Sequence, residues 1–400
     1  MTDQALSDLK VLDLTHYIAG PYCTKLLADY GAEVIKIEKP GDGDGSRKMG
    51  PFLGNKPHPE KSGLHLYLNT NKKGITLNLK SDTGRKIFRD LVKTVDIVVE
   101  NFEPRVMAGL GLDYEALDQI RPGLIMTSIS NFGQTGPYRD YKATELIAQA
   151  MGGILYLGGS PDREPVRQGL SQAQYMAGSA GAMGTLTVIY ARGETGIGQH
   201  IDVSIMETNT YPVLSPLNVY ASEGGVTGRL PGAGTIGAIG AAMPCKDGYC
   251  LPTPGLVTEL GTYGRMMGIP ELEQEEYQTL QGWILHLPEI TEKVSEKVSD
   301  MGKFDLFELC QAWRFSCGAI MSIDEVANCP HLHERGYLVE IERPETGRIT
   351  YPGAPFKLSE TPWEIRHPAP LLGQHNEEVY CNTLGYARDE LVKLHERGII

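Results

Sequence analysis

The first fifty residues alternate between short apolar runs and polar turns in a way that predicts a strand, a helix and a second strand. Residues 11–14 (VLDL) form the first apolar run, and residues 34–37 (VIKI) form the second. Between them, apolar residues recur at helical spacing until Gly31, a residue type that favours a helix end. We therefore expect a βαβ unit, with the carboxyl ends of both strands at one edge of a parallel sheet. His16 and Lys39 would lie on that edge.

The same alternation of predicted strands and helices continues to residue 130. Apolar runs predict strands over residues 74–79, 96–100 and 124–130, and Ser81 is placed to cap a helix over residues 82–94. Another helix is expected over residues 175–190, where glycine recurs every third residue. Close packing inside a core explains that spacing better than a membrane or dimer contact does. The pattern predicts an α/β fold with a Rossmann-like large domain.

The pattern changes after residue 210. Residues 215–254 are dense in glycine and proline, which predicts a linker or loop region. Residues 271–315 show helical spacing and predict the helical body of a smaller domain. Residues 335–400 return to short strands and a final helix.

Composition narrows the class of protein. With 41% hydrophobic and 22% charged residues, the chain has the composition of a globular protein. Its 50 acidic and 37 basic residues argue against a nucleic-acid binder, because such domains usually carry a basic surface. No apolar run approaches the roughly 20 residues of a membrane span, and the N-terminus lacks a secretory pattern. We expect a cytoplasmic enzyme with no membrane contact.

The seven cysteines are scattered and odd in number, which favours reduced thiols over a disulfide framework. Cys329, His331 and His333 alternate in a way that could attract a metal, but no fourth ligand is in view. We therefore expect no metal.

The turn after the first strand lacks the glycine fingerprint of a dinucleotide site, which argues against NAD. The stretch LDLTHYIAGPYCTKLLADYGAEVIKIEKPGDGD instead resembles the N-terminus of the class III coenzyme A transferases, also called the formyl-CoA transferase or carnitine-CoA transferase family. The resemblance continues in order over nearly the whole chain, in the segments NTNKKGITLNL, VENFEPRV, NFGQTGPY, LIAQAMGG, GIGQHIDVSIMET, PGAPFKLSETP and LGQHNEEV.

This resemblance implies a large CoA-binding domain built from residues 1–210 and 335–400. It implies that residues 211–334 form linkers and an inserted smaller α+β domain, and that two chains interlink as a dimer. The substrates would be an acyl-CoA and a free carboxylic acid. Residues 157–160 and the glycine-rich stretch Gly232–Gly240 would shape the acyl pocket, while the acyl donor and acceptor stay open.

The resemblance also implies which residues bind CoA. His16 and Ala19 would line the pantetheine and thioester end, and Asn101 with Phe102 would flank the cofactor. Three lysines would meet the nucleotide phosphates: Lys39, Lys72 and Lys73. Taken without these motifs, three lysines would more simply form a solvated surface.

The chain departs from the family at one CoA-binding position. Where members often carry a CoA-contacting arginine, this chain has Gly109. Arg105 lies nearby and is a candidate substitute.

A larger departure concerns catalysis. Members of the family use an aspartate whose carboxylate attacks the thioester, in a segment resembling P-V-R-x-G-x-x-x-A-D-x-x-x-G. Here the segment reads PVRQGLSQAQYMAG, and Gln174 takes the place of the aspartate. No acid lies between Glu164 and Glu194 that a shift of register could bring into place. A neutral amide cannot form the anhydride, although it can donate a hydrogen bond to a thioester oxygen.

Racemases of the same superfamily move a proton next to the thioester with a His-Asp pair and a second acid. Their histidine and aspartate would fall at Thr144 and Glu145, and their second acid would fall at Gln174. Two of the three groups are absent, so racemisation is the weaker prediction. Glu145 stays a candidate acid or base, with a helix cap or salt bridge as its structural alternative.

We therefore expect a subunit of a class III CoA transferase, in which a homologous partner subunit carries the nucleophilic aspartate. Some family members that act on benzylsuccinate have two unequal subunits, which supports this arrangement by resemblance. The alternative is a catalytically inert acyl-CoA-binding or scaffold protein.

Overall fold

The computed structural model describes residues 4–229, 242–253, 259–343 and 346–400. The chain divides into two compact units, which are described separately. The first comprises Met1–Leu155, Arg167–Gly224 and Arg335–Ile400, and the second comprises Tyr156–Val166 and Gly225–Glu334. The domain limits expected from the sequence, 1–210 with 335–400 and 211–334, stay a prediction.

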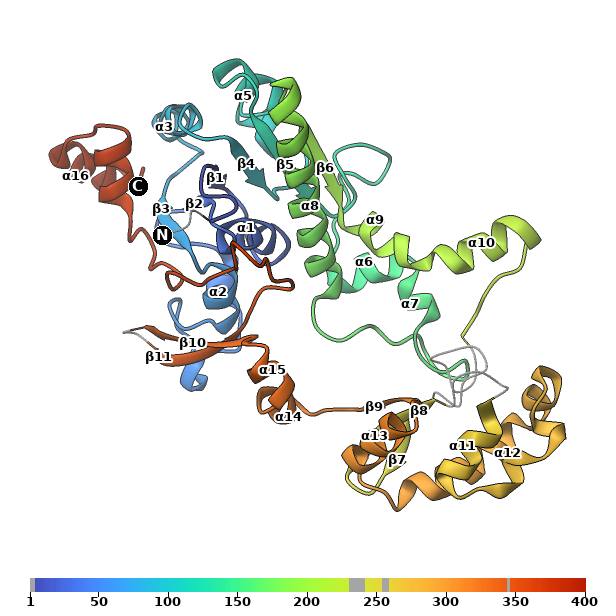
Figure 1. Ribbon diagram of the computed structural model, residues 1–400. Coiled ribbons are helices and arrows are strands. Elements are labelled where there is room, and N and C mark those ends of the chain that lie inside the picture. The colour runs from blue at the N-terminus through green and yellow to red at the C-terminus, as the bar shows by residue number, and fades with distance from the viewer. Residues whose placement is uncertain (1–3, 230–241, 254–258, 344–345) are drawn as a thin grey trace. The chain divides into compact units, whose positions relative to one another are not determined.

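A six-stranded parallel sheet forms the centre of the first unit (Figure 1). Its strand order is β3-β2-β1-β4-β5-β6, the order of Rossmann-like sheets, which reverses direction between β1 and β4. The predicted α/β fold is confirmed. The strands are β1 (Lys10–Asp13), β2 (Glu33–Glu38), β3 (Lys72–Thr76), β4 (Ile97–Glu100), β5 (Ile125–Ser130) and β6 (His200–Ser204).

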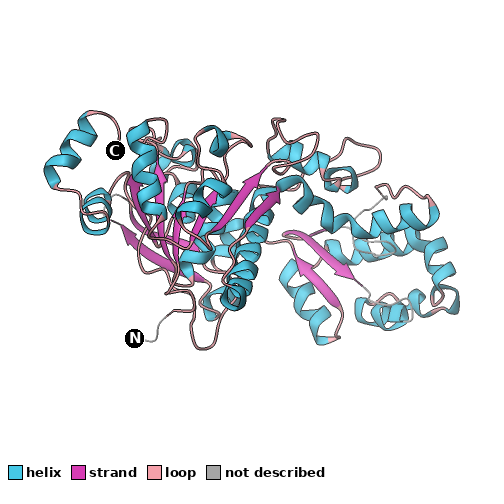
Figure 2. Ribbon diagram, turned by 90° about the horizontal axis from the view of Figure 1, so that it is seen from above, coloured by secondary structure: helices cyan, strands magenta, loops and turns pink. Residues whose placement is uncertain are grey.

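Helices lie along both sides of this sheet (Figure 2). One face packs against α3 and α5 and the C-terminal segment, and the other packs against α1, α8 and α9. Burial on both faces explains why the strands read as continuous apolar runs. The helices of this unit are α1 (Ala19–Asp29), α2 (Gly63–Leu68), α3 (Asp82–Val92), α4 (Val106–Gly109), α5 (Tyr114–Ile120), α6 (Glu145–Met151), α8 (Gln172–Thr195), α9 (Ile205–Thr210), α10 (Leu214–Glu223) and α16 (Arg388–Glu396).

Shorter elements complete the first unit. The strands β10 (Leu338–Arg343) and β11 (Gly347–Pro352) form an antiparallel pair, and Glu378–Thr383 is a π-helix. Single 3-10 turns occur at Gly45–Lys48, Leu53–Asn55 and Tyr211–Val213. The helix α7 (Ile154–Leu157) crosses from the first unit into the second.

The glycine-rich helix expected over residues 175–190 is α8, and it packs tightly as predicted. A Cβ added at Gly178 would lie 2.6 Å from the carbonyl oxygen of Ala19 in α1. One added at Gly181 would lie 2.9 Å from Cδ1 of Ile129 in β5. Glycine therefore lets α8 approach both α1 and the sheet. Within the described residues, no helix combines the length and apolarity needed to span a membrane.

Two expectations need correction. The strand expected over residues 74–79 is β3 and ends at Thr76, because the chain then leaves the sheet and the Asn78 N–H donates to the Ile399 carbonyl at 2.8 Å. Within the expected linker or loop region, residues 215–223 belong to α10, and residues 243–245 and 248–253 are strands. Pro216 is tolerated in α10 because the first helical turn needs no N–H from it.

The second unit has its own core. An antiparallel sheet of β7 (Met243–Cys245), β8 (Gly248–Thr253) and β9 (Ser316–Ala319) packs with the predicted helical segment. Its 3-10 turns are Pro270–Glu273 and Glu275–Tyr277. Its helices are α11 (Leu260–Met267), α12 (Leu280–Ser299), α13 (Lys303–Ala312), α14 (Ile323–Ala327) and α15 (Pro330–Glu334). His331 and His333, which alternate in the sequence with Cys329, lie in the helix α15.

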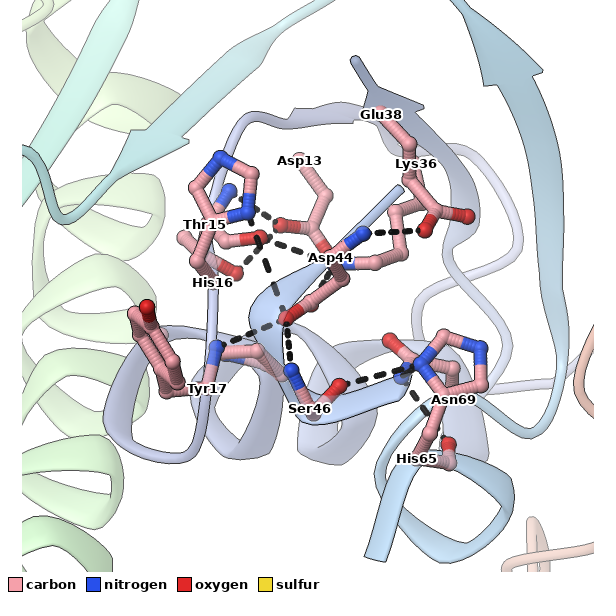
Figure 3. A network of polar contacts seen from close by, with 12 residues as sticks. Asp13, Thr15, His16, Tyr17, Lys36, Glu38, Asp44, Ser46, His65 and Asn69 are labelled. Atoms are coloured by element: carbon pink, nitrogen blue, oxygen red, sulfur yellow. Dashed lines mark hydrogen bonds and ion pairs between the residues drawn. The ribbon is translucent and has the colours of Figure 1, made fainter. Parts of the chain in front are cut away.

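A buried ionic network lies beneath the carboxyl edge of the large sheet (Figure 3). Asp44 pairs with Lys36 at 2.8 Å, and Asp13 pairs with Lys72 at 2.9 Å. Glu38 binds Arg47 through two hydrogen bonds of 2.7 and 2.8 Å. Three acids and three bases thus balance in charge, with all six side chains buried.

Asp13 and Asp44 also organise the backbone of this region. Asp44 Oδ1 accepts hydrogen bonds from the backbone N–H groups of Tyr17 at 2.9 Å and Ser46 at 2.8 Å. Burial alone would raise the pKa of Asp13, but Lys36, Lys72 and two hydroxyl groups lower it to about 2. The carboxylate is therefore ionised and fully bonded in the folded chain.

Replacing Lys36 with methionine tests this network. The variant leaves Asp44 buried without its cation, so we expect the free energy of unfolding to fall by roughly 3–5 kcal/mol. Chemical denaturation at neutral pH measures the change. The matched control is Lys93→Met, which removes an exposed lysine 2.7 Å from Asp90 and should cost less than about 1 kcal/mol. Equal losses in both variants would contradict the role assigned to the network.

Candidate active site

A cavity of about 750 Å³ opens at the carboxyl edge of the sheet, where the strand order reverses. We call it the edge cavity. It is lined by residues that follow β1, β2, β3 and β4, including His16, Lys39 and Phe102. The prediction that His16 and Lys39 share this edge is confirmed. Ligands of doubly wound sheets bind at such a reversal point.

The edge cavity combines an apolar surface with cations. Its apolar lining comes from Leu14, Ile37, Leu77, Val106 and Leu110. Three exposed lysines surround it: Lys39, Lys48 and Lys80. Such a surface suits a ligand with a flat apolar group and phosphates.

Asp42 partly neutralises the positive charge of these lysines. Lys39 and Lys48 bind it at 2.6 and 3.1 Å, and these hydrogen bonds lower the pKa of Asp42. Two lysines share one carboxylate and Lys80 adds a third cation, so these four side chains carry a net positive charge. Lys48 and Lys80 were not expected from the sequence. Lys80 comes directly after the strand expected over residues 74–79, so applying the edge rule to that strand would have identified it.

The turn after β1 is tied to the loop after β4. The His16 N–H donates to Asn101 Oδ1 at 2.7 Å, and Asn101 Nδ2 donates to the His16 carbonyl at 2.8 Å. The His16 ring lies 5.6 Å from the Phe102 ring. Burial and the nearby Lys36 ammonium lower the pKa of His16, so its ring is neutral at pH 7. Asn101 therefore holds His16 and Phe102 together at the strand reversal.

A second cavity, of about 540 Å³, contains Gln174 and Glu145 in its lining. We call it the Gln174 cavity. Tyr17 and Phe102 line both cavities, so they form a shared wall between the two. The two cavities are therefore neighbours on either side of these two rings.

Glu145 caps the start of α8 instead of lying free in the cavity. Its carboxylate accepts hydrogen bonds from the backbone N–H groups of Ala173 at 2.9 Å and Gln174 at 3.2 Å. The side-chain amide of Gln149 donates to it at 2.7 Å. The N-terminus of a helix favours such an anion. Glu145 therefore makes the contacts of a helix cap, which was the structural alternative to a role as acid or base.

Polar groups that the sequence did not identify also line the Gln174 cavity. Ser130 ends β5, and its buried Oγ has no hydrogen-bond partner within the described part of the chain. Arg139 and Lys142 lie at the same cavity, where Arg139 contacts Asp140 and Lys142 pairs with Glu103. Ser130 is an unengaged donor that a substrate oxygen could use.

Other expected residues do not converge on these cavities. Ala19 is fully buried in the core between α1 and α8. Lys72 is buried in the ionic network, where its Nζ bonds to Asp13 and to neighbouring oxygens. A phosphate cannot reach it there, so the expected phosphate contact of Lys72 does not fit. Lys73 lies at the opposite end of β3 and pairs with Glu33 at 2.6 Å and Glu378 at 2.9 Å.

Arg105 and Gly109 lie at the two ends of α4. Arg105 is exposed and pairs with Asp140 at 2.7 Å. Gly109 ends α4, and a Cβ built there meets nothing within 4 Å. Val106 and Leu110 of the same segment line the edge cavity, so position 109 has room for a longer side chain beside it.

Residues 157–160 and Gly232–Gly240 were the two loops expected to shape an acyl pocket. Residues 157–160 belong to the second unit, where Arg229 donates to the carbonyls of Tyr156 and Ser160 at 3.1 Å. Gly232–Gly240 lies outside the described residues.

Glu100, at the end of β4, is a further carboxyl group near the site. It accepts a hydrogen bond from the Phe102 N–H at 2.8 Å. Burial, aided by the charge of Asp202, raises the pKa of Glu100 from its ordinary value of 4.5 to about 7, although Ser128 and the Phe102 N–H act in the opposite direction. Glu100 therefore changes its protonation state near neutral pH while it is bonded to the loop that carries Asn101 and Phe102.

Glu100→Gln tests this coupling. Between pH 4.5 and 7 the unfolded Glu100 is ionised while the folded one stays protonated, so the wild-type chain loses stability as pH rises through this range. Glutamine keeps the acceptor and cannot ionise. We expect the variant to gain stability relative to wild type by up to about 3 kcal/mol, with the gain reaching a plateau above pH 7. Denaturant unfolding at several pH values measures it, and a difference that does not change with pH would contradict the assignment.

A family model described as CoA-transferase family III matches residues 6–376. The chain is 34% identical to a succinyl-CoA–D-citramalate CoA-transferase of Chloroflexus aurantiacus, over 99% of this chain and 98% of the relative. It is 32% identical to a formyl-CoA:oxalate CoA-transferase of Rhodopseudomonas palustris, over 99% and 97% of the two chains. The fold is similar to that of a CaiB/BaiF family protein from Brucella suis, with a TM-score of 0.85 and 28% identity over 95% of this chain and 100% of the other.

Proposed function

The chain belongs to CoA-transferase family III, and from this premise we propose that it binds acyl-CoA as the aspartate-lacking subunit of a heteromeric CoA transferase. The complex moves CoA from an acyl-CoA to a free carboxylic acid. The homologous partner subunit supplies the nucleophilic carboxylate. Two relatives of this chain are named for such transfers, with succinyl-CoA or formyl-CoA in the name.

The shared wall of the two cavities supports acyl-CoA binding. The nucleotide occupies the edge cavity, with its phosphates on Lys39, Lys48 and Lys80. The pantetheine arm passes Tyr17 and Phe102, and the thioester reaches the Gln174 cavity. The proposal rests on this one path. It leads from the exposed lysines to Gln174, which stands at the position of the family's aspartate.

The chemistry at the end of that path supports the partner subunit. Transfer needs a carboxylate that is first a nucleophile and then a leaving group. Gln174 is an amide, and the carboxylate of Glu145 is held by two backbone N–H groups at the start of α8 and by the side-chain amide of Gln149 in α6. Gln174 can stabilise a thioester oxygen by a hydrogen bond, but it cannot form the anhydride.

Lys39→Ala tests the edge cavity. It removes one cation from the phosphate surface, and we expect CoA to bind roughly fivefold more weakly, a loss of about 1 kcal/mol. Gly109→Arg should act in the opposite direction, because position 109 is open and lies beside the cavity. Isothermal titration with CoA measures both changes.

The matched control for Lys39→Ala is Lys73→Ala, which removes a lysine from the opposite edge of the sheet. It should leave the dissociation constant unchanged. If Lys73→Ala weakens binding and Lys39→Ala does not, CoA does not occupy the edge cavity.

Gln174→Asp tests the missing nucleophile. The wild-type chain alone should show no transfer, whereas the variant should show transfer at least roughly a hundredfold above background, because removing a nucleophile costs more than that in other enzymes. Acyl-CoA and acceptor acids are followed by mass spectrometry, with Gln174→Asn as the control that keeps an amide. Full transferase turnover by a wild-type homomer would refute the proposal.

Native mass spectrometry of protein from the source cell distinguishes the alternatives. A one-to-one complex with a related chain, in which only the partner traps a covalent CoA adduct, supports the heteromer. A chain that binds acyl-CoA but associates with no transferase subunit would be a binding or scaffold protein. Exchange of the α-proton of a 2-methylacyl-CoA, abolished by Glu145→Gln, would instead favour a racemase.

A further inference from the structure

An exposed carboxylate lies among the lysines of the edge cavity. Asp42 Oδ2 pairs with Lys39 Nζ at 2.6 Å, and Asp42 Oδ1 pairs with Lys48 Nζ at 3.1 Å. All three side chains are exposed, and all three residues line the edge cavity. The carboxylate therefore uses each of its two oxygens on a different lysine.

A tight turn presents Asp42 to these two lysines. Gly41 and Gly43, on either side of Asp42, have positive φ angles of 79° and 68°, which glycine adopts without strain. The Gly43 N–H donates to the Lys39 carbonyl at 3.0 Å, so the chain doubles back over residue 42. Lys48 ends the following 3-10 turn, which is capped by a carboxylate of the buried ionic network. The backbone thus fixes where the lysines begin, and their exposed side chains can exchange partners.

A ligand phosphate and the Asp42 carboxylate would use the same cations. Lysine binds phosphate as a point charge, and in the proposed acyl-CoA complex the phosphates meet Lys39 and Lys48. In the free chain Asp42 already neutralises part of the charge of both lysines. Ion pairs between exposed side chains are weak, so a phosphate that carries more charge than a carboxylate can displace Asp42.

We propose that Asp42 is an internal competitor for ligand phosphate, which holds Lys39 and Lys48 in the free site and leaves them when the ligand binds. This inference rests on the proposed function, because the competing phosphates are those of acyl-CoA. The observed dissociation constant equals that of the open site divided by the fraction of chains in which Asp42 is released, so Asp42 weakens binding. CoA also leaves more readily, because Asp42 takes the lysines back. In the part of the chain that the structure describes, Lys80 pairs with no acid, so it offers an incoming phosphate its first contact.

Two other roles for Asp42 give different results. If Asp42 positions the lysines for the ligand, its loss weakens binding. If Asp42 holds a magnesium ion that accompanies the phosphates, its loss weakens binding only when magnesium is present. In the described residues, no group of three or more Cys, His, Asp or Glu side chains is arranged to hold a metal.

Asp42→Asn tests the competition, because it removes the charge and keeps the size of the side chain. We expect CoA and inorganic pyrophosphate to bind the full-length variant roughly fivefold more tightly than wild type, since an exposed ion pair no longer competes. Isothermal titration with and without magnesium measures both dissociation constants, and Asp42→Ser should show the same gain. The matched control is Asp90→Asn, which removes a carboxylate 2.7 Å from Lys93 Nζ and outside the edge cavity. It should leave both dissociation constants unchanged.

A double-mutant cycle separates competition from the general effect of removing a negative charge. When Asp42 competes, Lys39→Ala loses a phosphate contact but also one ion pair that the ligand must break. We therefore expect Lys39→Ala to weaken CoA binding at least roughly twofold more in the Asp42→Asn chain than in wild type. Equal losses in the two chains would mean that Asp42 acts only through its distant field, and would overturn the proposal.

The outcomes also distinguish this inference from the proposed function. If wild type binds CoA and Asp42→Asn binds it equally or more weakly, with or without magnesium, the competition is refuted and the proposed function stands. If neither chain binds CoA but the variant binds pyrophosphate more tightly, the competition for phosphate stands and the proposed function fails. If neither ligand binds either chain, both are refuted.

Discussion

The charge balance beneath the carboxyl edge of the sheet is the constraint on which the site depends. A buried, unpaired charge would be strongly destabilising, so Asp13, Asp44 and Glu38 must each keep a cation within reach. The cationic partners come from β2, the loop after it and β3, whereas Asp13 lies in β1, so the network joins segments that are distant in sequence. Charge neutrality therefore fixes how the turn after β1 meets that loop, since Asp44 also binds the Tyr17 N–H.

The need to neutralise buried acids distinguishes two groups of lysines that the sequence alone does not distinguish. Lys36 and Lys72 are used to neutralise buried acids, whereas Lys39 and Lys80 stay exposed beside the edge cavity. A ligand phosphate can recruit only the exposed ones, because withdrawing Lys72 would leave Asp13 unpaired. The buried lysines thus stabilise the fold, and the exposed lysines are left to contact a ligand.

The same distinction shows what could be predicted from the sequence. Apolar periodicity is a local signal, so the strands β1, β2, β4 and β5 and the helix α8 were predicted close to their observed bounds. The edge position of His16 and Lys39 followed from the rule for parallel strands. The burial of Lys72 did not follow, because it depends on Asp13, fifty-nine residues earlier. The capping of α8 by Glu145 was also non-local, since twenty-eight residues separate it from Ala173.

That cap bears on why a glutamine is tolerated at the start of α8. The N–H groups of Ala173 and Gln174 are already satisfied by Glu145, so α8 needs no charge at residue 174 for its own stability. An aspartate there would line the same cavity as the Glu145 carboxylate, and like charges at short range raise a carboxyl pKa and cost stability. An amide avoids that repulsion and keeps a hydrogen-bond donor in the cavity. The observed contacts at the start of α8 therefore do not depend on a charge at residue 174, and the proposed acyl-CoA path is compatible with an amide there.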